Sequence, residues 1–527
     1  CFAVILGYYG TKYAWASFKI REISPSYWGP IIWPIKMIVP IGAFFLILQY
    51  LKDLIVQIHD VATNPREKKQ GLFNNPLVIG LVFAGLVAIS LWLFYYQPVV
   101  AFTLMMVTLL LFGVHIFAAL GLVGACGLFI VFGGEPTLIT IPKVAYASMD
   151  SFALVCIPLF VFCGEFLFKA DAGKQLYDMA SKWLGDLPGG LAVATVVACA
   201  VFAAISASSV ATALTIGLVA LPALRAYNYS KPLSYGTLAA GGTLGIMIPP
   251  SGPMIVYSAV TEESLGKLFI AGVIPGIMIS VLFILYIMIY QHYYTKKEEI
   301  QKAPSTTWKE KFKSIYDSKA ALMTPVIIVG GIYLGMFTPM EAAAVAVVYS
   351  LLIIIVRRKV TWRTSSKLMR EAMPSSITLL AIIMGALIMG HFMTMLDLPN
   401  MVIKAVNEAG LSRWGVMLML MFSFLVMGMF LEVISIMMIT LPIVYPLIIS
   451  LGFDGIWFAV IMVLNMELAL LTPPVGLNLF VIQSIEETNL SVILRGVWPF
   501  LIIIAIGIVI LALFPALATW LPNLMIN

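Results

Sequence analysis

The sequence predicts an all-α, polytopic membrane protein with an inverted internal repeat, two re-entrant helical hairpins and two broken helices. Hydrophobic residues make up 61% of its 527 residues and charged residues only 11%, whereas soluble domains are typically about 45–50% apolar and about 25% charged. Apolar runs close to the roughly 20 residues that cross a bilayer recur along the chain. Two of these runs are interrupted by consecutive prolines, at 249–250 and 473–474, which a continuous helix does not tolerate.

The N-terminal part is predicted to be a small module followed by a connecting helix. Residues 1–56 contain an apolar helix fragment and a clearer span that begins at Trp33, and residues 57–97 contain a polar linker and one further span. If the modules on either side have fixed orientations in the membrane, an odd crossing is needed between them, and this span would provide it. Because the chain starts at Cys1, without Met, we expect further residues before it.

The larger part is predicted to form two halves, 98–310 and 311–527, each with a hairpin of two short helices and a broken helix. The hairpin helices are too short to cross comfortably at about 1.5 Å per residue, so we expect them to turn back partway. The first half is predicted to contain spans 98–112, 114–132 and 149–168, hairpin helices 190–205 and 210–224, broken helix 233–260 and span 268–291. The second half is predicted to contain spans 320–336, 341–356 and 373–396, hairpin helices 415–430 and 434–449, broken helix 456–484 and span 496–521.

Two polar segments are expected to connect these spans. Residues 169–182 are charged, and residues 295–319 are the most polar stretch of the chain and have many lysines. We expect the second segment to be a cytoplasmic loop.

The two halves share one register. Pro473 follows Pro249 by 473 − 249 = 224 positions. The same difference relates Gly252 to Gly476, Glu262 to Glu486, Gly272 to Gly496, and Pro275 to Pro499. It also places Ser208 opposite Glu432, so the duplication includes both hairpins.

Positive charges give the two halves opposite orientations. Lys and Arg are enriched in cytoplasmic loops, and Lys182, Arg225 and Lys231 flank the first hairpin. This hairpin is therefore expected to enter from the cytoplasm. Lys319 and Arg357 fix a cytoplasmic start for the second half, so its hairpin opens to the other side. Opposed repeats are the plan of many secondary transporters.

Composition and motifs exclude several function classes. The net charge of +6 is explained by cytoplasmic Lys and Arg, and no basic stripe with interleaved aromatic residues indicates nucleic-acid binding. The sequence has no nucleotide-binding Gly-rich loop and no nucleophile, base or metal motif of an intramembrane enzyme. The five cysteines, His115 and His391 are predicted to be structural.

Polar residues at the hairpin tips and helix breaks form the candidate site. Helix N-termini attract anions, and unwound carbonyls suit a small hard cation. For the substrate we expect Ser208, Ser209, Thr212, Ser251, Glu432, Ser435 and Asn478. For cations we expect Ser206, Ser208, Gly245, Pro249, Ser251, Glu432, Thr472 and Val475.

Several of these candidates have a competing structural interpretation. Ser and Thr hydroxyls in membrane helices often bond only to their own helix. Glu432 is the stronger candidate, because a carboxylate inside a membrane is functional by default. Glu341, close to Thr338, is expected to cap a helix instead.

Five separated motifs resemble one transporter family. Residues 205–211 (Ile-Ser-Ala-Ser-Ser-Val-Ala), 248–251 (Ile-Pro-Pro-Ser), 272–276 (Gly-Val-Ile-Pro-Gly), 330–342 and 471–476 (Leu-Thr-Pro-Pro-Val-Gly) resemble the large membrane subunit of tripartite ATP-independent periplasmic (TRAP) transporters.

The resemblance covers about 98–527, and 1–56 looks like the end of the small membrane subunit, so the chain is similar to the fused small-plus-large type. It implies a bacterial inner-membrane importer that is driven by two or more sodium ions at the tips and breaks. It also implies a periplasmic substrate-binding protein as partner, an elevator motion and a single fused permease. Family members often have Gly at Ala207 and an acidic residue at Thr212, so the exact cation ligands stay open.

The leading hypothesis is therefore sodium-coupled import of a small carboxylate or sulfonate, of the dicarboxylate, sialic acid or isethionate class. The alternative is a stand-alone divalent-anion and sodium symporter, against which the small-subunit-like N-terminal segment argues. An intramembrane enzyme lacks the necessary motifs. A scaffold would leave the paired helix breaks unexplained.

Overall fold

The computed structural model describes residues 2–22, 33–44, 48, 76–149, 152–294, 306–357, 362–474 and 476–525. Within these ranges the chain forms helices and no strands, which confirms the all-α prediction. Among the same residues, eight helices are long and apolar enough to cross a membrane. The predicted linker at 57–75, much of the predicted span after Trp33, and Val475 lie outside the described residues.

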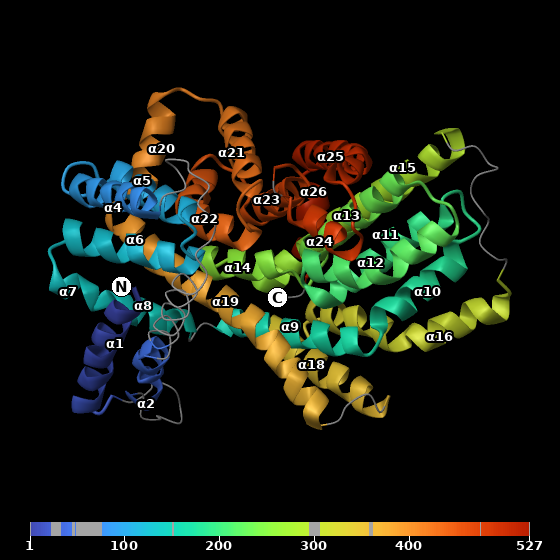
Figure 1. Ribbon diagram of the computed structural model, residues 1–527, viewed down its shortest axis with the longest axis horizontal. Coiled ribbons are helices and arrows are strands. Elements are labelled where there is room, and N and C mark those ends of the chain that lie inside the picture. Colours follow the sequence, from blue (N-terminus) through green and yellow to red (C-terminus); the bar gives the residue numbers. More distant parts are fainter. Residues whose placement is uncertain are drawn as a thin grey trace. The chain divides into compact units, whose positions relative to one another are not determined.

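The chain divides into two compact units. Figure 1 labels the helices along the chain. The first unit comprises Cys1–Ser151 and Thr378–Met401, and the second comprises Phe152–Ile377 and Val402–Asn527. Each unit therefore contains segments from both predicted halves. Both hairpins and both broken helices belong to the second unit, which we call the hairpin unit.

The described part of the first unit is a set of packed helices, and both predicted hairpins belong to the other unit. Its described helices are α1 (Phe2–Lys19), α2 (Trp33–Lys36), α4 (Pro76–Leu93), α5 (Pro98–Leu111), α6 (Ile116–Val131), α7 (Glu135–Leu138), α8 (Thr140–Met149) and the last part of α19 (Trp362–Met395). Helix α1 packs on α2 and α8, and α5 packs on α4 and α6. The buried Lys36 ammonium pairs with Glu22 at 2.5 Å and lies over the Tyr13 ring, so the one charge on α2 is compensated.

The hairpin unit contains most of the helices. They are α9 (Phe152–Lys169), α10 (Ala172–Leu184), α11 (Gly190–Ser206), α12 (Ser209–Ala226), α13 (Lys231–Met247), α14 (Gly252–Thr261), α15 (Leu265–Tyr294), α16 (Trp308–Pro325), the π-helix η2 (Val326–Gly330), α17 (Gly331–Tyr333), α18 (Pro339–Val356), the first part of α19, α21 (Arg413–Gly428), α22 (Val433–Ser450), α23 (Gly455–Leu470), α24 (Leu477–Ile485), α25 (Leu490–Leu513) and α26 (Ala516–Asn523). Helix α20 (Leu398–Glu408) crosses the boundary between the units.

Both predicted hairpins are present. Helix α11 packs along α12, and α21 along α22. The second arms, α12 and α22, have 18 residues each and are longer than the sequence predicts. Helix propagation costs little once a helix has begun, and neither Pro222 nor the pair Pro442 and Pro446 ends its arm.

Three polar or terminal segments differ from the prediction. The charged segment 169–182 is mostly helix α10, which buries Leu176 and Tyr177 and exposes Lys174 and Asp178. Helix α16 begins inside the predicted loop, because Thr307 and Glu310 form a capping box there. The predicted last span is split into α25 and α26 at Phe514, since the residue before a proline is driven out of the helical region.

The first broken helix runs from the base of one hairpin to the base of the other. Helix α13 starts five positions after α12 ends at Ala226, and hence at the base of the first hairpin. Beyond the break, α14 packs on α22. There Glu263 accepts a hydrogen bond from the Tyr445 hydroxyl at 2.8 Å, and Tyr257 donates to the Gly455 carbonyl at 2.7 Å. Both contacts lie at the base of the second hairpin.

The second broken helix runs the opposite way. Helix α23 starts at Gly455, beside the base of the second hairpin, and α24 packs on α12. Beyond α24, Glu486 pairs with Arg225 at 2.7 Å and accepts from Tyr235 at 2.6 Å. These partners mark the base of the first hairpin, so the two repeats are inverted within the unit.

Candidate functional site

The first hairpin tip is a short turn held by its own hydroxyl groups. Ala207 adopts the left-handed conformation, with φ of 52°, which reverses the chain after α11. Ser208 caps α12 and accepts from the Ala211 amide at 3.3 Å. The Thr212 hydroxyl lies 2.8 Å from both the Ser206 hydroxyl and the Ser208 carbonyl oxygen. The predicted residues at this tip therefore form one compact polar cluster.

The first helix break is bridged by Ser251. Helix α13 ends at Met247, and the Pro249–Pro250 peptide bond is cis. Ser251 is fully buried, caps α14 by accepting from the Met254 amide at 3.4 Å, and donates to the Ile246 carbonyl. One side chain thus satisfies groups on both sides of the break, as the missing helical bonds require.

The tip and the break touch each other. A Cβ atom on Gly245 would lie 2.5 Å from the Ser208 carbonyl oxygen, and one on Gly252 would lie 3.4 Å from that of Ala207. Only a residue without a side chain permits the first approach. The structure therefore brings the first predicted set of tip and break residues together.

A buried hydrogen bond joins this cluster to the second repeat. Asn478, in the first turn of α24, donates to the Ser209 hydroxyl at 2.7 Å, and its Oδ1 lies 2.9 Å from the same hydroxyl. The Asn478 amide also approaches the Ala239 carbonyl of α13 at 3.3 Å. Two predicted substrate residues, 269 positions apart, thus meet directly.

The second tip is built around Glu432. It is the N-cap residue of α22, and the Ser435 hydroxyl donates to its Oε2 atom at 3.4 Å. Below the tip, a Cβ on Gly428 would lie 2.4 Å from the Ala469 Cβ of α23, so this hairpin also packs closely against its own broken helix.

At the second break, one predicted residue bonds within its own helix and another lies outside the described residues. The Pro473–Pro474 bond is cis, like its counterpart, and Gly476 has φ of 59°. The Thr472 hydroxyl donates to the Leu468 carbonyl at 2.7 Å within its own helix, so only its lone pairs are available to a ligand. Val475 occupies the position equivalent to Ser251 but lies outside the described residues.

The arrangement offers two kinds of ligand group. Four helices, α12, α14, α22 and α24, begin at a tip or a break, and their N-terminal amides favour an anion. Carbonyls and hydroxyls of the unwound segments favour a small hard cation. The described residues contain no group of three or more His, Cys, Asp or Glu side chains that could hold a metal ion.

The second broken helix contains three buried polar residues, Asn465, Glu467 and Asn478. Asn478 was predicted, but Asn465 and Glu467 were not, although both are buried within α23. The Asn465 amide donates to the Met421 carbonyl of α21 at 3.0 Å and fastens the hairpin arm to the broken helix. A carboxyl inside an apolar helix is the signal that could have identified Glu467.

Other sequence predictions concern residues away from this site. Thr338 and Glu341 form the expected capping box at the start of α18. Cys156, Cys163 and Cys199 are buried and Cys126 is partly buried, as predicted for structural cysteines, while Cys1 lies outside the described residues.

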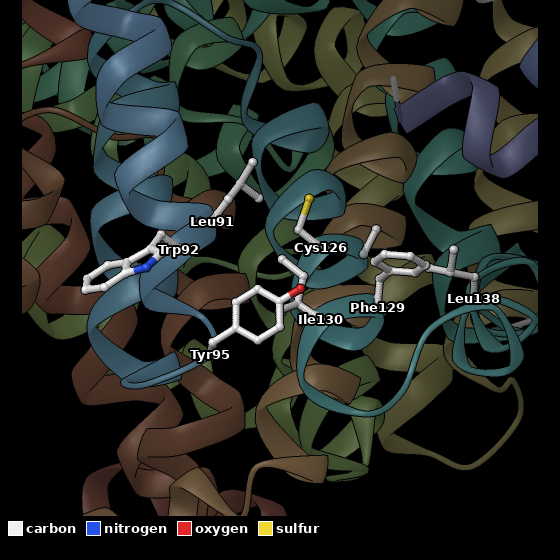
Figure 2. Close-up of a pocket in the computed structure, with 8 residues that line it drawn as sticks. Leu91, Trp92, Tyr95, Cys126, Phe129, Ile130 and Leu138 are labelled. Atoms are coloured by element: carbon white, nitrogen blue, oxygen red, sulfur yellow. The ribbon is translucent and has the colours of Figure 1, made fainter.

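A separate pocket in the first unit has a different character. It encloses about 540 Å³ between α4, α6 and α7 (Figure 2) and is lined by Leu91, Trp92, Tyr95, Ala125, Cys126, Phe129, Ile130 and Leu138. Apart from the Trp92 indole N–H and the Tyr95 hydroxyl these side chains are apolar and none is charged, so the pocket suits hydrocarbon better than a small anion.

The chain is similar to known transporter proteins. Residues 103–517 match the model of the family described as the tripartite ATP-independent periplasmic transporter, DctM component. The C4-dicarboxylate TRAP transporter large permease protein DctM of Pseudomonas aeruginosa is 38% identical over 72% of this chain and 88% of its own length. The isethionate TRAP transporter permease protein DctMQ of Oleidesulfovibrio alaskensis is 33% identical over 84% of this chain and 69% of its own.

A solved structure shares the fold. The YdaH transporter of Alcanivorax borkumensis, described as having an unusual topology, superposes with a TM-score of 0.53. The match covers 81% of this chain and 98% of that one at 14% identity.

Proposed function

This chain belongs to the family of the DctM component of tripartite ATP-independent periplasmic transporters, and from that membership we propose that it is a sodium-coupled importer of a small organic anion. It is a multi-pass protein of the bacterial inner membrane and a TRAP transporter permease for organic acids, not an enzyme. The resemblance seen in the sequence, including the similarity to the fused type, is thereby confirmed. Sodium coupling, the substrate and the motion are the proposal.

The main support for the proposal is that the two repeats, each with a hairpin tip and a helix break, have opposite orientations in the hairpin unit. Each broken helix starts beside its own hairpin and ends at the base of the other. Inverted repeats with discontinuous helices place substrate and coupling ions at the repeat interface. The buried bond between Ser209 and Asn478 lies at such an interface.

Sodium would occupy two sets of oxygen atoms. The first set comprises the groups at the first tip and break, on Ser206, Ser208, Gly245, Pro249 and Ser251. The second set comprises Glu432, Thr472 and Val475. Ser251 supports the first set, because it uses its proton and one lone pair in bridging the break and keeps one lone pair for a ligand.

The anion would lie between these sets, against the helix N-termini and the side chains of Ser208, Ser209, Thr212, Ser251, Glu432, Ser435 and Asn478. A carboxylate or sulfonate fits this environment, since both accept several hydrogen bonds. Relatives named for C4-dicarboxylates and for isethionate support these two groups, and sialic acid is a further carboxylate of the same class.

The proposed partner is a periplasmic substrate-binding protein, and the proposed motion is an elevator movement of the hairpin unit. The compactness of that unit, which holds both hairpins and both breaks, supports movement as one body. We further propose that one fused chain acts as a monomer.

Uptake by the purified chain in proteoliposomes tests the function. A sodium gradient with a matching binding protein is expected to drive accumulation of a dicarboxylate or isethionate, and replacement of sodium by choline is expected to abolish it. Equal uptake in choline would overturn sodium coupling. Uptake without any binding protein would instead favour the stand-alone symporter.

A further inference from the structure

Glu467 is a buried carboxyl group of the hairpin unit, five residues before Thr472 of the second break (472 − 467 = 5). It lies on α23, three residues before that helix ends, and its exposed fraction is 0%. Neither carboxyl oxygen has a hydrogen-bond partner among the described residues. An ionised carboxylate in such surroundings costs far more free energy than a neutral carboxyl.

Thr243 lies near this carboxyl on α13, a helix that packs directly against α23, and no hydrogen bond joins the two side chains among the described residues. Subtraction gives 467 − 224 = 243, so the two residues occupy equivalent positions in the two repeats. Equivalent positions of an inverted repeat meet where its pseudo-two-fold axis passes. Glu467 and Thr243 therefore mark that axis, between the first halves of the two broken helices.

The hydrogen bond that Thr243 already makes limits how its hydroxyl can bond to Glu467. Its hydroxyl donates to the Ala240 carbonyl at 2.8 Å. A hydroxyl has one proton, so while it keeps this bond Thr243 can accept from Glu467 but cannot donate to it. A carboxylate has nothing to donate, whereas a protonated carboxyl has one O–H group.

Charged groups that could compensate an ionised Glu467 are remote. Among the described residues of the helices that pack against α23 and their caps, the charged or readily protonated side chains are Lys231, Glu262, Lys267, His292, Arg413, Glu432 and Arg495, each in the first or last two turns of its helix or at its cap.

We propose that Glu467 is a proton-binding site, which holds its proton in this conformation and directs the carboxyl O–H to the Thr243 oxygen. The resulting series of hydrogen bonds runs from the Glu467 O–H to the Thr243 hydroxyl and from there to the Ala240 carbonyl. The neighbouring Ala239 carbonyl accepts a hydrogen bond from the Asn478 amide. The ligand is a proton, and Glu467 is thereby distinct from the oxygen sets proposed for sodium.

Infrared difference spectroscopy of the full chain in lipid tests this proposal without depending on transport, so its outcome is separate from that of the uptake experiment. The wild-type spectrum minus that of Glu467→Gln, at neutral pH, is expected to show the C=O stretch of a protonated carboxylic acid. Gln keeps the size and a donor toward Thr243, and we expect this variant to fold.

The matched variant Thr243→Val removes the acceptor and keeps the volume. It is expected to shift the same C=O band to higher frequency, because the carboxyl loses its hydrogen-bond acceptor. A carboxylate band in place of the acid band at neutral pH would overturn the proposal. An acid band that Thr243→Val leaves unshifted would overturn the assigned acceptor.

Discussion

The Ser209 hydroxyl and the Asn478 side-chain amide meet at 2.7 Å, although each belongs to a different repeat. Ser209 opens the second arm of the first hairpin, and Asn478 lies in the first turn of the helix that follows the second break. Both are buried. This contact joins the first tip to the end of the second broken helix and places two potential anion ligands side by side.

Changing Asn478 to Asp is expected to abolish uptake of the anion. The change keeps the shape of the side chain but puts a negative charge where an anionic substrate would bind, and it removes the donor to Ser209. Asn478→Ala is expected to raise the KM for uptake about tenfold, which corresponds to about 1.4 kcal/mol.

The control for Asn478 is Ser423→Ala on α21, whose exposed hydroxyl bonds only to the Met419 carbonyl of its own helix. We expect wild-type KM from the control. A KM for Asn478→Ala that equals that of the control would remove Asn478 from the substrate site.

Adding one methyl group at Gly245 is expected to damage the site. In Gly245→Ala the new Cβ would lie 2.5 Å from the Ser208 carbonyl oxygen, so the hairpin tip must move. Overpacking of this kind typically costs about 1–3 kcal/mol, and we expect both lower thermal stability and loss of sodium-dependent uptake.

Gly80→Ala on α4 is the matched control, because a Cβ there meets nothing within 4 Å. Its melting temperature and uptake are expected to equal those of the wild type. Normal uptake in Gly245→Ala would show that the tight contact between tip and break is dispensable.

The contacts at Glu486 predict unequal effects of two substitutions. Arg225 is 66% exposed and Glu486 14%, so the ion pair itself contributes at most about 1 kcal/mol. Arg225→Ala is therefore expected to change the melting temperature little. Glu486→Ala also leaves the Tyr235 hydroxyl without its acceptor and is expected to lower the melting temperature more. The reverse order of melting temperatures would contradict this assignment.

The inverted orientation predicts opposite labelling of two acidic residues. Glu262 and Glu487 are exposed and follow the first and second broken helices. A membrane-impermeant thiol reagent is expected to label Glu262→Cys in intact spheroplasts and Glu487→Cys only in inverted vesicles, relative to the parent chain. Labelling of both from one side would contradict the inverted repeat.

Much of this architecture could be predicted because local chemistry fixes it. Consecutive prolines must break a helix, and the constant offset of 224 positions from Pro249 to Pro473 identifies the partner break. The capping box at Thr338 and Glu341 was likewise predictable from residue types and spacing.

The remaining features depend on tertiary packing. The contact between Ser209 and Asn478 follows from how two repeats interlock, which no local pattern encodes. Glu467 was not predicted as a site residue, because it lies inside a continuous helix and not at a tip or a break. The offset of 224 positions gives Thr243 as its counterpart, and the structure places the two residues on helices that pack together.

Sodium-gradient uptake by Ser208→Phe and Glu432→Ala, compared with the wild type in proteoliposomes, tests most directly whether the two tips bind the transported ions and anion. Both variants are expected to reach wild-type levels in the membrane and to lose sodium-dependent uptake, since each removes a ligand or fills the space at one tip. Unchanged uptake in both variants would contradict a transport site at the tips.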